Sequence, residues 1–74
     1  MAKAFSGKKV VLILQKIYGF HIVHQKGSHL KLRKFAGKEV VTTIVPLHRE
    51  LATGTLHGLL KLANIEYKEF LRHG

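Results

Sequence analysis

Two short glycine-containing segments, Lys26-Gly27-Ser28 and Ala36-Gly37-Lys38, constrain the fold of this chain most strongly. They separate three runs with the composition of β-strands, residues 20–25, 29–35 and 39–45. A parallel crossover needs a dozen residues or more, so connections this short must join antiparallel neighbours. The sequence therefore predicts a three-stranded antiparallel sheet whose strands follow one another in chain order.

The middle run alternates between apolar and polar side chains. Leu30 and Leu32 point to one side of the predicted strand, and His29, Lys31 and Arg33 point to the other. We expect helices to cover the leucine side, because a small sheet must bury one apolar face. The basic side chains then lie on the open face of the sheet.

Helical patterns stand before and after the three runs. Ser6 is a suitable N-cap for a first helix that ends near Gly19. Thr53 can cap a second helix, Asn64 can end it, and residues 66–72 are long enough for a short third helix. The side chains expected to face the core are Val10, Val11, Leu14, Ile17 and Tyr18 in the first helix, Leu56, Leu59, Leu60 and Ala63 in the second, and Tyr67, Phe70 and Leu71 in the third.

The expected architecture is an α+β fold of order α-β-β-β-α with a short C-terminal helix. A chain of 74 residues has room for a single domain, spanning 1–74. It contains no cysteine, which excludes disulfides and thiolate metal sites. Its longest apolar run, Val10 to Leu14, is far shorter than a membrane span, and its start lacks the apolar stretch of a signal peptide. We therefore expect a cytoplasmic protein without a membrane partner.

The net charge restricts the partners. Thirteen Lys and Arg stand against four Asp and Glu, which gives a formal charge of +9. Such an excess destabilises a compact chain by self-repulsion, and a polyanion or an acidic protein relieves it. RNA, DNA and anionic membranes all qualify on charge alone. The alternative is a basic surface without any special site, as in a ribosomal or thermophilic protein.

The segment Gly27-Ser28-His29 with Lys31 and Arg33 carries the residues best suited to chemistry. Glycine allows close backbone approach, and the serine N–H and hydroxyl can hold a phosphate oxygen. An imidazole can accept and donate protons near neutral pH. A base, with cations beside it, can cleave RNA without a metal by activating the 2′-hydroxyl. The competing interpretation is that His29 is simply a solvated histidine on a basic strand.

The remaining histidines give weaker indications. His48 stands between Pro46 and Arg49 and is a candidate for a second phosphate or acid–base contact, although an ordinary loop histidine is the simpler interpretation. Lys26 extends the basic surface. A regular strand places His21 and His24 on opposite faces. No spacing of His, Asp and Glu predicts a metal site, and no cofactor motif is present.

The chain from Ser6 to Leu71 resembles the HicA (YcfA-like) mRNA interferase toxins. Four pieces carry the resemblance in order: Ser6-Gly7-Lys8 with the segment from Leu14 to Phe20, the central run from Val23 to His29, the strand end from Val45 to His48, and the helix from Gly54 to Ala63. Two departures are Lys9, where the family often has Glu, and His57-Gly58, where Arg-Ser is more usual.

This resemblance implies a fold like that of double-stranded-RNA-binding domains and cleavage of mRNA by His29. It also implies neutralisation by a separate HicB-type antitoxin with an acidic surface, with the toxin a monomer alone and part of a hetero-oligomer with its antitoxin. The phosphate contacts expected are Lys26, Gly27, Ser28, Lys31, Arg33 and His48. Two alternatives stay open: a double-stranded RNA binder without chemistry, and an inactive family member that serves as a structural partner of an antitoxin.

Overall fold

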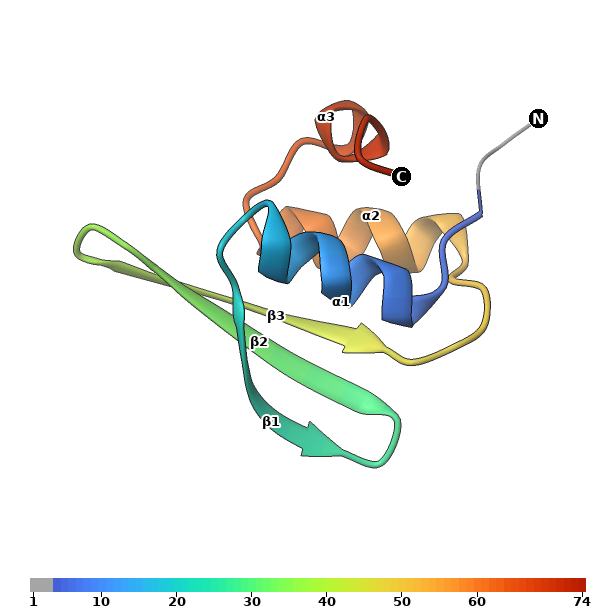
Figure 1. Ribbon diagram of the computed structural model, residues 1–74, viewed down its shortest axis with the longest axis horizontal. Helices are drawn as coiled ribbons and strands as arrows, with labels where there is room; N and C mark the ends of the chain where they lie inside the picture. Colours follow the sequence, from blue (N-terminus) through green and yellow to red (C-terminus); the bar gives the residue numbers. More distant parts are fainter. Residues whose placement is uncertain (1–3) are drawn as a thin grey trace.

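The computed structural model describes residues 4–74 and confirms the α+β architecture (Figure 1). All three strands lie within one residue of their predicted bounds, and the predicted short C-terminal helix is present. The elements in chain order are α1 (Gly7–Lys16), β1 (His21–Lys26), β2 (His29–Ala36), β3 (Glu39–Pro46), α2 (Thr53–Leu62) and α3 (Tyr67–Leu71).

The three strands form one antiparallel sheet in the order β1-β2-β3. Both hairpins turn through a glycine with positive φ, Gly27 at 59° and Gly37 at 63°, a conformation that other residues adopt at a steric cost. The β2–β3 pairing is regular over its whole length. The β1–β2 pairing shifts register between Ile22 and His24, which makes Val23 the extra residue of a β-bulge.

Helix α1 begins at the predicted cap and ends at Lys16, before the predicted end near Gly19. The Ser6 hydroxyl accepts a hydrogen bond from the Lys9 N–H at 3.1 Å, and Gly19 follows the helix with a φ of 75°. The prediction that Ile17 is buried was wrong, since 53% of it is exposed. The helix ends at Lys16, so Ile17 lies at the C-cap and turns away, while Ile13 is buried on the helix face instead.

Helix α2 packs on the sheet with the predicted stripe of apolar side chains, Leu56, Leu59, Leu60 and Ala63, all buried. Its predicted cap is wrong by one residue. Thr53 is the first helical residue, and Ala52, which lacks a side-chain acceptor, occupies the N-cap position. Asn64 has the left-handed φ of 59° expected after the helix.

Both long helices lie on one face of the sheet, as Figure 1 shows, and the core lies between these two layers. The β2 leucines, Leu30 and Leu32, are buried there as predicted. The only buried polar side chain of residues 4–74, Thr43, donates its hydroxyl proton to the Leu59 carbonyl oxygen at 2.7 Å. This hydrogen bond joins β3 to α2, so the helix cannot slide along the sheet without breaking it.

Helix α3 closes the other side of the helical layer. Phe70 is fully buried, and Tyr67 and Leu71 pack partly buried against the core, as predicted. The Tyr18 hydroxyl donates a hydrogen bond to the Glu69 carboxylate and so ties the segment after α1 to α3. None of the helices within residues 4–74 is long and apolar enough to cross a membrane.

Candidate functional site

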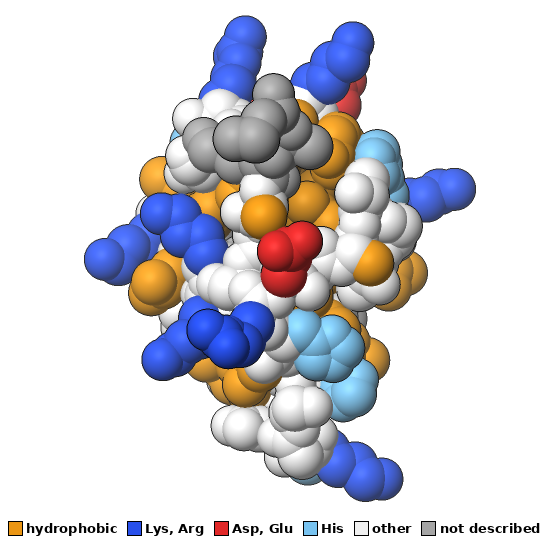
Figure 2. Space-filling model, turned by 90° about the vertical axis from the view of Figure 1, so that its right-hand side faces the viewer, with side chains coloured by type: hydrophobic (Ala, Val, Ile, Leu, Met, Phe, Trp, Pro, Cys, Tyr) orange, Lys and Arg blue, Asp and Glu red, His pale blue; other side chains and the backbone are white. Residues whose placement is uncertain are grey.

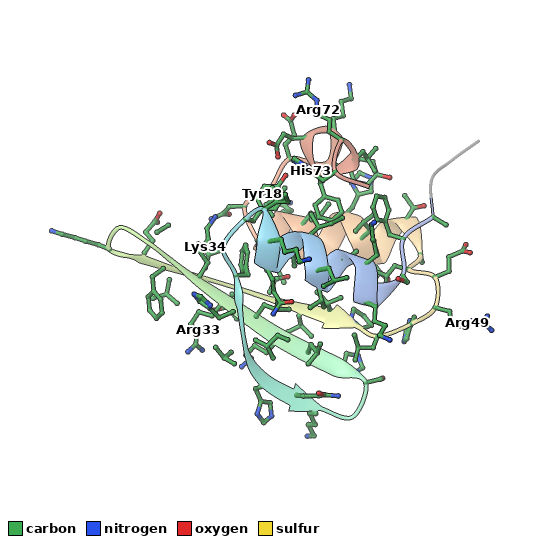
Figure 3. All side chains as sticks on the ribbon, viewed as in Figure 1. Tyr18, Arg33, Lys34, Arg49, Arg72 and His73 are labelled. Atoms are coloured by element: carbon green, nitrogen blue, oxygen red, sulfur yellow. The ribbon has the colours of Figure 1, made fainter. Side chains whose placement is uncertain are left out.

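The sheet face opposite the helices presents the basic side chains of β2. His29 is exposed, and Lys31 and Arg33 are partly exposed, on the face that Leu30 and Leu32 do not use. Figure 3 shows Arg33 projecting from the sheet away from the helices. Lys34 lies on the opposite side, with its ammonium 5.2 Å from the centre of the buried Phe20 ring. The predicted alternation of β2 is therefore present.

Strand β1 adds two histidines to this face, contrary to the prediction that His21 and His24 face opposite sides. His24 pairs with Lys31 and His21 pairs with Arg33. Directly paired residues of an antiparallel ladder project to the same face of a sheet. The extra residue in the bulge, Val23, shifts the alternation by one position and brings both imidazoles to the open face.

His29 lines a small open hollow in the exposed sheet face. The hollow has a volume of about 270 Å³. Four of its lining side chains carry nitrogen, namely His24, Lys26, His29 and Lys31, and the fifth is the apolar Ile44. Lys26 pairs directly with His29 across the two strands. The His29 imidazole therefore has the Lys26 side chain opposite it on β1 and the Lys31 side chain two residues further along β2.

The turn that precedes His29 is held by its backbone. Gly27 accepts a hydrogen bond on its carbonyl oxygen from the Gln25 side-chain amide at 3.1 Å. The Ser28 carbonyl oxygen accepts from the Leu47 N–H at 2.6 Å, which fixes the turn to the segment after β3. The Ser28 side chain itself is exposed and is not among the residues that line the hollow. The predicted Gly-Ser-His segment thus lies on a well-connected backbone.

His48 is not brought into the same hollow. It lies in the loop after β3, where its carbonyl oxygen accepts the Gly7 N–H at 2.9 Å. Its exposed side chain lines a different depression, together with Ser6, Lys8 and Arg49. Of the predicted phosphate contacts, Lys26 and Lys31 line the hollow with His29, Arg33 lies further along the same face, and His48 stands apart.

The positive charge that β1 and β2 present on the open face is not balanced by acids on these two strands. None of the four acidic residues of the chain belongs to β1 or β2. They lie at the far hairpin, in the β3–α2 loop and around α3: Glu39, Glu50, Glu66 and Glu69. On the side of the molecule in Figure 2, Lys and Arg side chains project around the whole outline, and acidic ones are few. The arrangement suits an anionic polymer laid across the sheet.

The donors for a metal ion are not gathered in one place. Within residues 4–74, no group of three or more His, Cys, Asp or Glu side chains is positioned to hold one.

His24 is the histidine of this face that the sequence did not predict. The face to which its side chain points depends on the bulge at Val23. The residues of β1 give no signal that Val23 is an extra residue in the pairing with β2.

These observations define a class of protein. It is a small basic α+β domain that carries an imidazole among cations on its uncovered sheet face. A family model for the HicA toxin of bacterial toxin–antitoxin systems matches residues 7–65. The match covers most of the chain, and the chain belongs to the HicA toxin family. It is thus the toxin component of a toxin–antitoxin pair. Comparisons with curated proteins and with solved structures gave no match.

Proposed function

We propose that this toxin is a metal-independent endoribonuclease that cleaves mRNA with His29 as general acid–base. The observation that carries the proposal is the position of His29, exposed on the open sheet face and paired with Lys26. A general base must reach the proton that it abstracts, and an uncovered sheet face lets an RNA strand approach the imidazole. Membership of the HicA toxin family supports the same activity.

The chemistry needs few groups. The His29 imidazole takes the proton of a ribose 2′-hydroxyl, and the resulting oxygen forms a bond to the adjacent phosphorus. The bond from phosphorus to the 5′-oxygen breaks, and the departing 5′-oxygen takes up a proton. Lys26 and Lys31 line the same hollow and stabilise the charge that builds on the phosphate oxygens. Since DNA lacks the 2′-hydroxyl, this route acts on RNA alone.

The rest of the face positions the strand. The side chains from His29 to Arg33 span roughly 14 Å along β2, enough for about two phosphates. The Ser28 hydroxyl and the N–H groups around Gly27 can bind a further phosphate oxygen at the rim. His48 faces another depression, so its contact with RNA would be more distant. The fold, with its helices behind a three-stranded sheet, is compatible with the double-stranded-RNA-binding-domain likeness implied by the family.

The partners follow from the same surface. RNA is the substrate, and the antitoxin is a HicB-type protein whose acidic surface covers the His29 face in the complex. The free toxin is a monomer in this proposal, and it acts in the cytoplasm, where mRNA is reached. The uncompensated cations of β1 and β2 serve both encounters, because each partner is anionic.

Expression in cells tests the proposal. Wild type is expected to arrest growth and degrade RNA, and His29→Ala to do neither while reaching the same soluble level. His21→Ala serves as the matched control, since it removes an exposed histidine that does not line the hollow. RNA that is bound but never cut by the wild-type protein would favour a non-catalytic binder. An unaffected His29→Ala variant would contradict the role of this residue.

A further inference from the structure

His24 has no role in the proposal above, yet it lines the same hollow as His29. The β-bulge at Val23 places it there, directly opposite Lys31 on the open face. Lys31 is two residues along β2 from His29, so His24 and His29 are diagonal neighbours across the strand pair. Diagonal neighbours in an antiparallel ladder are about 7–8 Å apart, close enough for two side chains to approach one small group from either side.

Cleavage of RNA by its own 2′-hydroxyl requires a second proton transfer. The attacking oxygen gives up a proton, and the departing 5′-oxygen must gain one, because an alkoxide is a poor leaving group in water. The two lysines that line the hollow, Lys26 and Lys31, are suited to stabilising charge on the phosphate oxygens rather than to donating a proton. An imidazole is the side chain best matched to this task.

We propose that His24 is the general acid of the cleavage, acting opposite His29 on the same phosphodiester. This inference rests on the proposed ribonuclease function. The 2′-oxygen of the ribose forms a bond to phosphorus while the bond from phosphorus to the 5′-oxygen breaks. His29 receives the 2′-hydroxyl proton, and protonated His24 gives its proton to the 5′-oxygen. The products are a 2′,3′-cyclic phosphate and a free 5′-hydroxyl, and proton exchange with water restores both histidines.

The groups around His24 come from its own strand, from the paired strand β2 and from β3. Lys26 is on its own strand, Lys31 is opposite, and the pair His21 and Arg33 follows next along the sheet. From β3 the hollow receives Ile44, which does not titrate. No carboxylate belongs to β1 or β2, and His24 and His29 are the two imidazoles that line the hollow.

His21 provides a matched control. It lies on the same strand and the same face as His24, and it is likewise exposed. It pairs with Arg33 and is not among the residues that line the hollow. Replacing it removes one imidazole from the basic face without touching the proposed pair.

The test uses purified full-length protein and a single-stranded RNA whose cleavage site has been mapped with wild type. His24→Ala is expected to cut on the order of 10²–10⁴-fold more slowly, and His21→Ala at nearly the wild-type rate. His24→Arg keeps a cation but cannot release a proton, so it should be as slow as His24→Ala. Wild-type speed in His24→Arg would overturn the inference, because His24 would then be needed only for its charge.

A second substrate separates acid catalysis from a structural effect. In it, sulfur replaces the 5′-bridging oxygen at the cleaved bond, and a thiolate leaves without protonation. His24→Ala should cleave this RNA at close to the wild-type rate, whereas His29→Ala should stay slow. Equal deficits of His24→Ala on both substrates would refute an acid role. The pH–rate profile of wild type should have two limbs, and His24→Ala should lose the alkaline one.

These outcomes also separate this inference from the proposed function. A wild-type protein that cuts RNA, loses cutting in His29→Ala and keeps it in His24→Ala would retain the ribonuclease and refute the acid role of His24. Absence of cutting by purified wild type would overturn both. Circular dichroism of each variant verifies that these substitutions at exposed strand positions leave the fold intact.

Discussion

The rings of Phe5 and Phe70 lie 5.4 Å apart, centre to centre, with their planes tilted by 52°. Phe5 precedes α1 and Phe70 belongs to α3, so this contact joins the two ends of the described chain. Both side chains are almost fully buried, and both lie outside the part of the chain that the family model matches. The C-terminal helix is therefore part of the core of this protein.

Removing the Phe70 ring should destabilise the whole domain. Phe70→Ala is expected to lower the free energy of unfolding by about 3–5 kcal/mol, because it leaves a cavity under α3. A domain this small has little stability to lose, so Phe70→Leu, with a smaller expected loss, keeps the comparison measurable. Urea unfolding gives both values. Phe35→Ala is the control, since 69% of Phe35 is exposed, and it should change stability by under ~0.5 kcal/mol. A small effect at Phe70 would contradict the account of α3.

Gly7 is the position where a side chain fits least. A Cβ there would lie 2.0 Å from the Pro46 carbonyl oxygen and 2.8 Å from the Leu47 Cα. Gly7→Ala should therefore force the start of α1 away from the end of β3 and cost about 1–3 kcal/mol or more. Gly58→Ala meets nothing within 4 Å and should stabilise α2 by up to ~1 kcal/mol. Thermal unfolding should thus shift in opposite directions for these two glycine-to-alanine changes. A shift in the same direction would show that the α1–β3 contact is looser than described.

The Thr43 hydroxyl is expected to contribute a modest, specific stabilisation. Thr43→Val keeps the shape of the side chain and removes the hydrogen bond to the Leu59 carbonyl oxygen, which still accepts from the Ala63 N–H at 3.1 Å. The loss should be about 0.5–1.5 kcal/mol in urea unfolding. Thr42→Val, on the open face, loses only the long 3.5 Å hydrogen bond that the Thr42 hydroxyl oxygen accepts from Arg33 Nε, and should stay close to wild type. If the two variants were equally stable, the hydrogen bond between β3 and α2 would make no net contribution to the free energy of unfolding.

Stability at alkaline pH should depend on Tyr18. Burial raises the pKa of Tyr18 well above its ordinary value near 10, and the hydrogen bond to Glu69 and the charge of that carboxylate raise it further. Above about pH 10 the unfolded chain releases this proton while the folded chain retains it, so stability is present below that pH and is lost as the pH rises. Tyr18→Phe has no hydroxyl proton to release, so it lacks this pH-dependent contribution to stability. Its melting temperature should fall less between pH 8 and pH 10.5 than that of wild type. Parallel falls would exclude the Tyr18–Glu69 contribution.

The fold was largely predictable because its determinants are local. The Ser6 cap, the glycine turns between strands and the alternation of β2 are all expressed within a few neighbouring residues, and each is present in the structure. Ile17 and Thr53 show that the prediction from sequence was wrong at the ends of helices. Whether the last apolar residue packs inward, or which residue begins the helix, depends on where the chain turns next, and propensities differ little over one position.

The arrangement of the side chains on the open face was predictable for β2 and not for β1. His29 and Lys31 share a face because regular strand alternation holds along β2. His24 joins them through one extra residue at Val23, and a bulge of this kind depends on how two strands pair rather than on the residues of one strand. Close approaches such as that of Gly7 to Pro46 likewise arise between segments distant in the chain.

The most direct measurement of the central claim is the cleavage rate of a defined RNA by purified wild-type and His29→Ala proteins, with EDTA present. Cleavage by wild type should persist in EDTA, and the variant should cleave on the order of 10²–10⁴-fold more slowly at unchanged circular dichroism. Equal rates for the two proteins, or a wild-type activity that EDTA abolishes, would contradict it.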